Sequence, residues 1–107
     1  MKTGIELITE ERQRQIEKEG WTAEHDAEHK EGEIALAAVC YATPSEFLTF
    51  RPASMFDEQS DFKTPELWPW ANNWFKPAPD NKIKSRIIEL QKAGALIAAE
   101  IDRLNSL

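Results

Sequence analysis

The sequence predicts an all-α fold: a small helical bundle of three main helices, with an ordered aromatic- and proline-rich irregular segment between the second and the third. Three observations predict it: capping signals near the N-terminus, a regular 3-4 spacing of apolar residues near the C-terminus, and the confinement of all six prolines to residues 44–79. The 107 residues are expected to form one domain, divided into a helical hairpin (1–43), the irregular segment (44–80) and a long C-terminal helix (81–105).

The first helix is expected to run from Thr3 to Glu19. Thr3 and Glu6 have the spacing of a capping box, in which each side chain accepts a hydrogen bond from the backbone amide of the other residue. Gly20 is a natural left-handed stop, and Trp21 beyond it can fold back on the last helical turn. Local signals therefore define both ends of this helix.

A second helix is expected from Glu31 to Ala42, because the stretch is rich in good helix formers and Pro44 prevents its continuation. The polar residues before it leave open a start near Ala23. The lone Cys40 cannot form an intramolecular disulfide, and we expect it to be a buried thiol in this helix. The apolar positions that recur at helical spacing are Ile34, Ala37, Ala38 and Tyr41.

The irregular segment holds eight of the ten aromatic residues of the chain. A disordered linker would be poor in aromatic residues, so we expect this segment to pack on the helices as an ordered flap with short helical turns. The eight residues are Phe47, Phe50, Phe56, Phe62, Trp68, Trp70, Trp74 and Phe75.

The C-terminal helix has the clearest periodicity, with apolar positions separated alternately by four and three residues, which is a heptad seam. The seam consists of Ile83, Ile87, Leu90, Gly94, Ile97, Ile101 and Leu104. We expect it to pack on the first two helices as the core of the bundle, with Gly94 permitting close approach of a neighbour. A second apolar row through Ile88, Ala95 and Ala98 widens the face, so we also expect a homo-oligomer, most simply a dimer.

Composition and charge exclude several classes of protein. With 19 acidic and 13 basic residues the net charge is −6, which provides no basic surface for generic nucleic-acid binding. No apolar stretch has the length of a membrane span and the N-terminus does not enter an apolar signal sequence, so a cytoplasmic location without membrane contact is expected. The four glycines are isolated, which excludes a P-loop or a dinucleotide-binding loop.

Polar chemistry concentrates in residues 24–33, which hold both histidines. If this stretch is helical, His25, His29 and Glu33 are four residues apart in succession and share one face. Two imidazoles and a carboxylate so placed can bind one metal ion. A solvated acidic helix start, which is common in proteins, is the alternative interpretation and is given equal weight.

A carboxylate of this region can also pair with the C-terminal helix. In a bundle, Glu33 can face Glu89 or Glu100, and carboxylates from facing helices are a frequent metal site. An exposed helix surface is the simpler interpretation of Glu89 and of Glu100. Glu33 is therefore the strongest carboxylate candidate.

Five motifs stand in order along the chain, at residues 11–15, 20–21, 25–29, 31–35 and 89–101. The first, second and fourth motifs have the sequences Glu-Arg-Gln-Arg-Gln, Gly-Trp and Glu-Gly-Glu-Ile-Ala. The third begins and ends with histidine, and the fifth is rich in alanine. This arrangement resembles a family of small uncharacterised proteins of phages and prophages. That family is in turn similar to the small MazG-like members of the all-α nucleoside triphosphate pyrophosphohydrolases.

The resemblance implies a phage-type accessory protein that binds, or hydrolyses, a nucleotide with a divalent metal, Mg²⁺ or Mn²⁺. The candidate binding residues are His25, Asp26, His29, Lys30, Glu33 and Glu89, of which Glu33 and His29 are the candidate metal ligands. The candidates for stacking on a base are Trp68, Trp70 and Trp74. The chain departs from the MazG-like pattern where His29 and Lys30 replace paired glutamates and where Arg86 replaces an acid of the second motif.

A different class of function also fits the composition. A small acidic accessory protein can bind and inhibit a host or defence-system protein. Its contact surface would be the aromatic-rich segment or residues 1–33, which hold ten acidic and five basic residues. Metal-dependent hydrolysis of a nucleoside triphosphate would distinguish the two classes.

Overall fold

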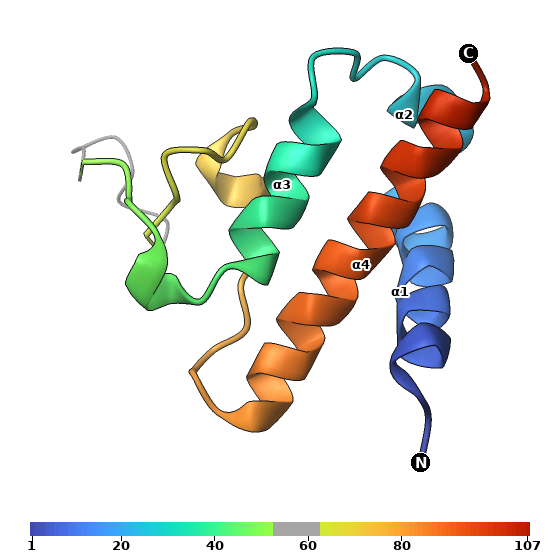
Figure 1. Cartoon of the computed structure of the whole chain (residues 1–107). Coiled ribbons are helices and arrows are strands. Elements are labelled where there is room, and N and C mark those ends of the chain that lie inside the picture. Colours follow the sequence, from blue (N-terminus) through green and yellow to red (C-terminus); the bar gives the residue numbers. More distant parts are fainter. Residues whose placement is uncertain (53–62) are drawn as a thin grey trace.

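A computed structural model of the chain describes residues 1–52 and 63–107. In these two stretches, four α-helices and two short 3-10 turns follow one another, and Phe50 and Pro65 form an isolated β-bridge. The elements are α1 (Gly4–Glu19), α2 (Ala23–Asp26), α3 (Glu33–Ala42), η1 (Ser45–Phe47), η2 (Asn72–Trp74) and α4 (Ile83–Asn105) (Figure 1). The predicted all-α class is confirmed. No helix of the described residues is both long and apolar enough to cross a membrane.

Helix α1 begins and ends as the local signals predict. The Thr3 hydroxyl accepts a hydrogen bond from the Glu6 amide at 3.3 Å, and the Glu6 carboxylate accepts one from the Thr3 amide at 3.1 Å. Gly20 has a φ of 72°, in the left-handed region that glycine adopts at low cost. The Trp21 amide then donates to the Gln15 carbonyl at 3.1 Å, which closes the helix end.

Helix α4 runs between α3 and α1 and packs against both (Figure 1). The side chains that it buries are mostly small: Ser85, Ala93, Ala95, Leu96 and Ala99. A Cβ atom added to Gly94 would lie 2.5 Å from Cδ1 of Ile8, so α1 approaches α4 most closely at this glycine. The close approach predicted at Gly94 is therefore made within the chain.

The prediction that the heptad seam forms the core of the bundle is wrong for the single chain. Its six large aliphatic side chains expose between 42% and 80% of their surface. These residues, hereafter the outer face of α4, are Ile83, Ile87, Leu90, Ile97, Ile101 and Leu104. The physical reason is the central position of α4, because two neighbouring helices pack closely on its small residues and leave the side with the large residues uncovered.

The predicted second helix is divided into two. Thr22 caps the short α2 by accepting a hydrogen bond from the His25 amide at 3.3 Å, and α3 begins only at Glu33. Between them Gly32 has a φ of 82°, which no right-handed helix contains, so the helix cannot run through this point. The single helical face predicted for His25, His29 and Glu33 is therefore not formed.

The irregular segment contributes to the core, as predicted, in the parts that the structure describes. Trp68 and Phe75 are buried and contact the Tyr41 ring of α3, with ring centroids 5.6 Å and 5.3 Å from it. Cys40 is a buried free cysteine, which confirms the prediction for this residue. Phe56 and Phe62 lie outside the described residues.

Candidate functional site

A cleft of about 350 Å³ opens beside α2, at the lower end of the volume range of ligand pockets. The residues that line the cleft lie in three places: in the turn after α1, in α2 and the turn that follows it, and in the stretch around η2. The residues that line it, hereafter the aromatic cleft, are Trp21, His25, His29, Trp70, Ala71 and Trp74. Five of its six residues carry a planar ring.

Four of these rings contact one another in a closed sequence, in which each ring contacts the next and the last contacts the first. The ring centroids lie 6.5 Å apart for Trp21 and His25, 4.9 Å for His25 and His29, 5.3 Å for His29 and Trp70, and 6.3 Å for Trp70 and Trp21. Trp21 and His25 are nearly parallel, with 6° between their planes. Rings at such distances support each other's orientation, so the lining of the cleft is pre-formed.

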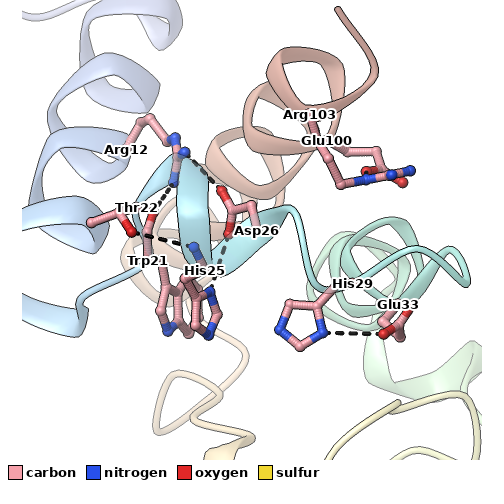
Figure 2. Close-up of polar contacts among 9 residues, drawn as sticks. All are labelled: Arg12, Trp21, Thr22, His25, Asp26, His29, Glu33, Glu100 and Arg103. Atoms are coloured by element: carbon pink, nitrogen blue, oxygen red, sulfur yellow. Dashed lines mark hydrogen bonds and ion pairs between the residues drawn. The ribbon is translucent and has the colours of Figure 1, made fainter. Parts of the chain in front are cut away.

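A buried ion pair fixes Trp21 and α2 to the first helix. Arg12 donates from Nη1 to the Trp21 carbonyl at 3.1 Å and from Nη2 to Oδ2 of Asp26 at 3.0 Å (Figure 2). The side chains of Arg12 and Asp26 expose only 13% and 7% of their surface. Asp26, a predicted binding residue, is therefore a positioning residue for the aromatic cleft.

Both imidazoles meet a carboxylate through the same ring nitrogen. Nδ1 of His25 lies 3.3 Å from Oδ1 of Asp26, and Nδ1 of His29 lies 3.1 Å from Oε2 of Glu33. A carboxylate at Nδ1 favours a proton on that nitrogen and leaves Nε2 as a hydrogen-bond acceptor. Figure 2 shows the second ring nitrogen of His29 on the side of Trp21 and His25, away from Glu33.

Glu33 keeps its negative charge beside His29. Burial would raise its pKa, but hydrogen bonds from its own amide, from His29 and from the Glu31 amide outweigh burial and lower the pKa below the ordinary value. The ionised carboxylate therefore holds His29 in one orientation at neutral pH.

Contacts with the irregular segment hold Trp70. Arg51 donates to the backbone carbonyls of Trp68 and Trp70 and to the side chain of Asn72. The Trp70 indole N–H is buried and has no acceptor among the residues that the structure describes. The contact with Arg51, and not a partner of its own indole N–H, therefore fixes Trp70 in the lining of the aromatic cleft.

Trp74 completes the cleft at its solvent side, with 49% of its surface exposed. The ammonium group of Lys76 lies 5.8 Å from the centroid of the Trp74 ring and 4.0 Å from Oε2 of Glu19. A positive charge therefore stands next to the aromatic cleft, in a protein whose net charge is −6.

Trp68 does not belong to the cleft, so its predicted role in base stacking is wrong. Its surface is only 2% exposed, and its indole N–H donates to the Ala71 carbonyl at 3.1 Å. It packs in the core between Tyr41 and Phe75, with its ring centroid 5.3 Å from that of Trp70. Trp68 supports Trp70 from inside the protein.

Glu33 and Glu89 do not face each other, which corrects the predicted carboxylate pair. Glu89 accepts a hydrogen bond from Arg86 at 3.0 Å, and Arg86 also donates to the Ala42 carbonyl at the C-terminal end of α3. Glu33 begins the same helix. A ten-residue helix spans on the order of 15 Å, too far for both carboxylates to bind one ion.

No three His, Cys, Asp or Glu side chains converge on a metal-binding position in the described part of the chain. The predicted ligands His29 and Glu33 hydrogen bond to each other, and Glu100 pairs with Arg103 (Figure 2). Lys30 is exposed to solvent and does not line the cleft. The predicted site residues that the structure brings together are therefore His25, His29, Trp70 and Trp74.

Trp21 lines the aromatic cleft and Arg12 holds it in place, but neither residue is predicted from the sequence to belong to this site. The sequence predicts Trp21 only as the hydrophobic partner of the Gly20 helix stop, although Trp21 precedes His25 by four residues and His29 by eight. Such spacing was a usable signal that the three rings lie close together. Nothing in the sequence indicates that Arg12 reaches the Trp21 carbonyl, because that contact depends on how α1 and α2 pack.

Comparison of the chain with models of protein families, with curated proteins and with solved structures finds no match. The resemblance to MazG-like proteins stays a prediction from the motifs. The aromatic cleft is therefore interpreted from its own chemistry.

Proposed function

We propose that this protein binds a nucleotide, with the base held in the aromatic cleft. The observation that carries the proposal is the closed sequence of four rings, extended to solvent by Trp74. Stacking of a base on an aromatic side chain contributes about 1–3 kcal/mol and tolerates any base, since every base has a flat π-face. A cleft of about 350 Å³ has the size of a small ligand.

The polar groups of the cleft favour a nucleobase as the ligand over a purely apolar ring. The two imidazoles offer acceptor nitrogens, because a carboxylate meets Nδ1 of each ring. The edge of a nucleobase carries both N–H donors and nitrogen or carbonyl acceptors. A base can therefore donate hydrogen bonds to the imidazole nitrogens, whereas an aliphatic ligand would leave them unpaired at a cost in free energy.

The charge beside the cleft supports a phosphate on the same ligand. The Lys76 ammonium group lies 5.8 Å from the centroid of the Trp74 ring, which lines the cleft. A phosphate there would compete with Glu19 for the ammonium group, which lies 4.0 Å from that carboxylate. We therefore expect a nucleoside monophosphate to bind more tightly than the corresponding nucleoside.

Binding is tested by titrating the protein with nucleosides and their mono- and triphosphates, followed by calorimetry and by quenching of tryptophan fluorescence. Trp74→Ala removes an exposed ring and is expected to weaken binding by about 5- to 150-fold, the equivalent of one stacking contact. Phe47→Ala is the matched control, because it removes an exposed aromatic ring outside the cleft and should leave affinity unchanged. Absence of binding by every ligand, or equal loss in both variants, contradicts the proposal.

The same titrations include Mg²⁺ and Mn²⁺, with release of pyrophosphate measured in parallel. Lys76→Gln should reduce the affinity for a monophosphate and leave that for the nucleoside unchanged. An equal effect on both ligands would show that the phosphate does not lie near Lys76.

A further inference from the structure

The outer face of α4 is an apolar surface that nothing in the described chain covers. Its six large aliphatic side chains lie along a helix of 23 residues, on the order of 35 Å long. Single exposed apolar residues are ordinary on protein surfaces, but an elongated contiguous patch marks an interaction site. None of the six residues lines the aromatic cleft. The surface therefore needs an explanation separate from ligand binding.

The spacing on this face indicates what covers it. Alternating steps of four and three residues give a repeat of 3.5, which keeps apolar side chains facing a second helix over the whole length as the two helices coil around each other. A short groove or a flat surface on another protein would not require this repeat. In the described chain α1 and α3 already occupy other sides of α4. A partner helix of the same repeat and length is the α4 of a second copy.

The charges at the two ends of α4 indicate the orientation of such a pair. The first turn contains no acidic residue, and Lys82 and Lys84 stand beside the positive end of the helix dipole. Lys84 and Asp102 are 18 residues apart, which is five helical turns, so they lie on the same side of α4. Neither side chain forms an ion pair with another residue of the described chain.

We propose that the outer face of α4 docks on the same face of a second copy of this chain, with the two α4 helices antiparallel. This arrangement is a two-fold symmetric interface in which each apolar face covers the other. It brings Lys84 of each copy close to Asp102 of the other, and it places each basic helix start beside the negative end of a helix dipole. A parallel pair would instead bring like charges together.

The first experiment measures the mass of the full chain by sedimentation and light scattering from micromolar to submillimolar concentration. The wild type is expected to be a dimer, and the variant Leu90→Glu/Ile97→Glu is expected to be a monomer with an unchanged helical circular-dichroism spectrum, because both positions are exposed in the single chain. Ile88→Glu is the matched control: its side chain is 44% exposed, but a residue two positions from Leu90 does not share its face.

A dimer is expected to persist in Ile88→Glu. A wild type that stays monomeric at the highest concentration overturns the proposal, and the outer face of α4 would then be the binding surface for a different protein. A dimer that survives Leu90→Glu/Ile97→Glu overturns it as well.

The second experiment tests the orientation by reversing charges. Lys84→Glu and Asp102→Lys are each expected to raise the dissociation constant several-fold, and the double variant Lys84→Glu/Asp102→Lys is expected to restore it. Glutamate at the start of α4 favours the helix dipole, so weakening by Lys84→Glu cannot be attributed to loss of the helix. A double variant weaker than either single variant overturns the antiparallel arrangement.

Discussion

The aromatic cleft and the outer face of α4 both expose large apolar side chains, but they are built in different ways. In the cleft, polar contacts fix the rings: Arg12 holds the Trp21 carbonyl and Glu33 holds the His29 imidazole. On the outer face, six aliphatic side chains are aligned by the helical repeat alone. A cleft with a fixed lining fits a small planar ligand, whereas a straight apolar face fits a second helix.

This difference shows that exposed apolar residues can belong to surfaces that are built, and can be disturbed, in different ways. The cleft depends on contacts between elements that are distant in the sequence, so substitutions of buried polar residues should disturb it. The outer face depends on one helix, so single substitutions there should leave the folded chain intact. The predictions that follow test this contrast between the two regions.

The largest expected effect is that of Arg12→Ala. It leaves the Asp26 carboxylate, whose side chain is 7% exposed, without its ion-pair partner, and breaking a buried pair in this way costs about 3–5 kcal/mol. Urea unfolding measures the change in the free energy of unfolding. Lys2→Ala is the control, because Lys2 pairs with Glu10 at the surface, where the two side chains are 59% and 51% exposed, and its loss should cost less than about 1 kcal/mol. Equal effects would mean that the cleft is not held by the buried pair.

A pair of substitutions on α4 compares a buried with an exposed side chain. Leu96→Ala removes a buried side chain and should reduce the free energy of unfolding by about 2–5 kcal/mol. Ile88→Ala removes an exposed one and should cost less than about 1 kcal/mol. The measurement is urea unfolding followed by circular dichroism. The reverse order would show that Ile88, and not Leu96, faces the core.

A substitution at Gly94 tests how closely α1 packs on the inner side of α4. A Cβ atom at this position would lie 2.5 Å from Cδ1 of Ile8, so Gly94→Ala forces Ile8 to move, and such overpacking costs about 1–3 kcal/mol. In an Ile8→Ala background the same substitution should stabilise the protein, by up to about 1 kcal/mol, because only helix propensity then differs. Thermal unfolding of the four proteins measures this coupling. Identical effects in both backgrounds would exclude the contact.

A smaller effect is expected from pH at the cleft. The pKa of Glu33 is lowered in the folded protein from its ordinary 4.5, so its contribution to stability is present above that pH and is lost as the pH falls through the folded value. We expect Glu33→Gln to lose less stability than the wild type between about pH 5 and pH 3, by about 1 kcal/mol or less for this partly exposed pair. Parallel unfolding curves for both proteins across this range would contradict the assignment.

The smallest effect concerns Cys40, on the α3 side of the core. Burial raises the pKa of its thiol to about 11, so the reactive thiolate is scarce at pH 8 and access is blocked. A disulfide reagent should modify the native protein slowly and the urea-unfolded protein rapidly, without a change in stability. Rapid modification of the native protein would mean that this part of the core opens frequently.

Some features of this protein follow from the sequence alone because they depend on neighbouring residues. The capping box at Thr3 and the left-handed Gly20 define α1, and Pro44 ends α3 within two residues. The long repeat from 83 to 104 identifies α4 and its apolar side. Spacing also identified His25 and His29 as members of a polar cluster, and both line the aromatic cleft.

Other features were decided only by tertiary structure, because they depend on which elements pack together. Helix α4 lies between two neighbours, so its small residues became its core side and its large ones stayed outside, although hydrophobicity alone favours the opposite. Trp68 and Trp70 are two residues apart, yet one is buried in the core and the other lines the cleft. The buried contact of Arg12 with Asp26 fixes that cleft, and a contact between two helices leaves no periodic pattern in the sequence.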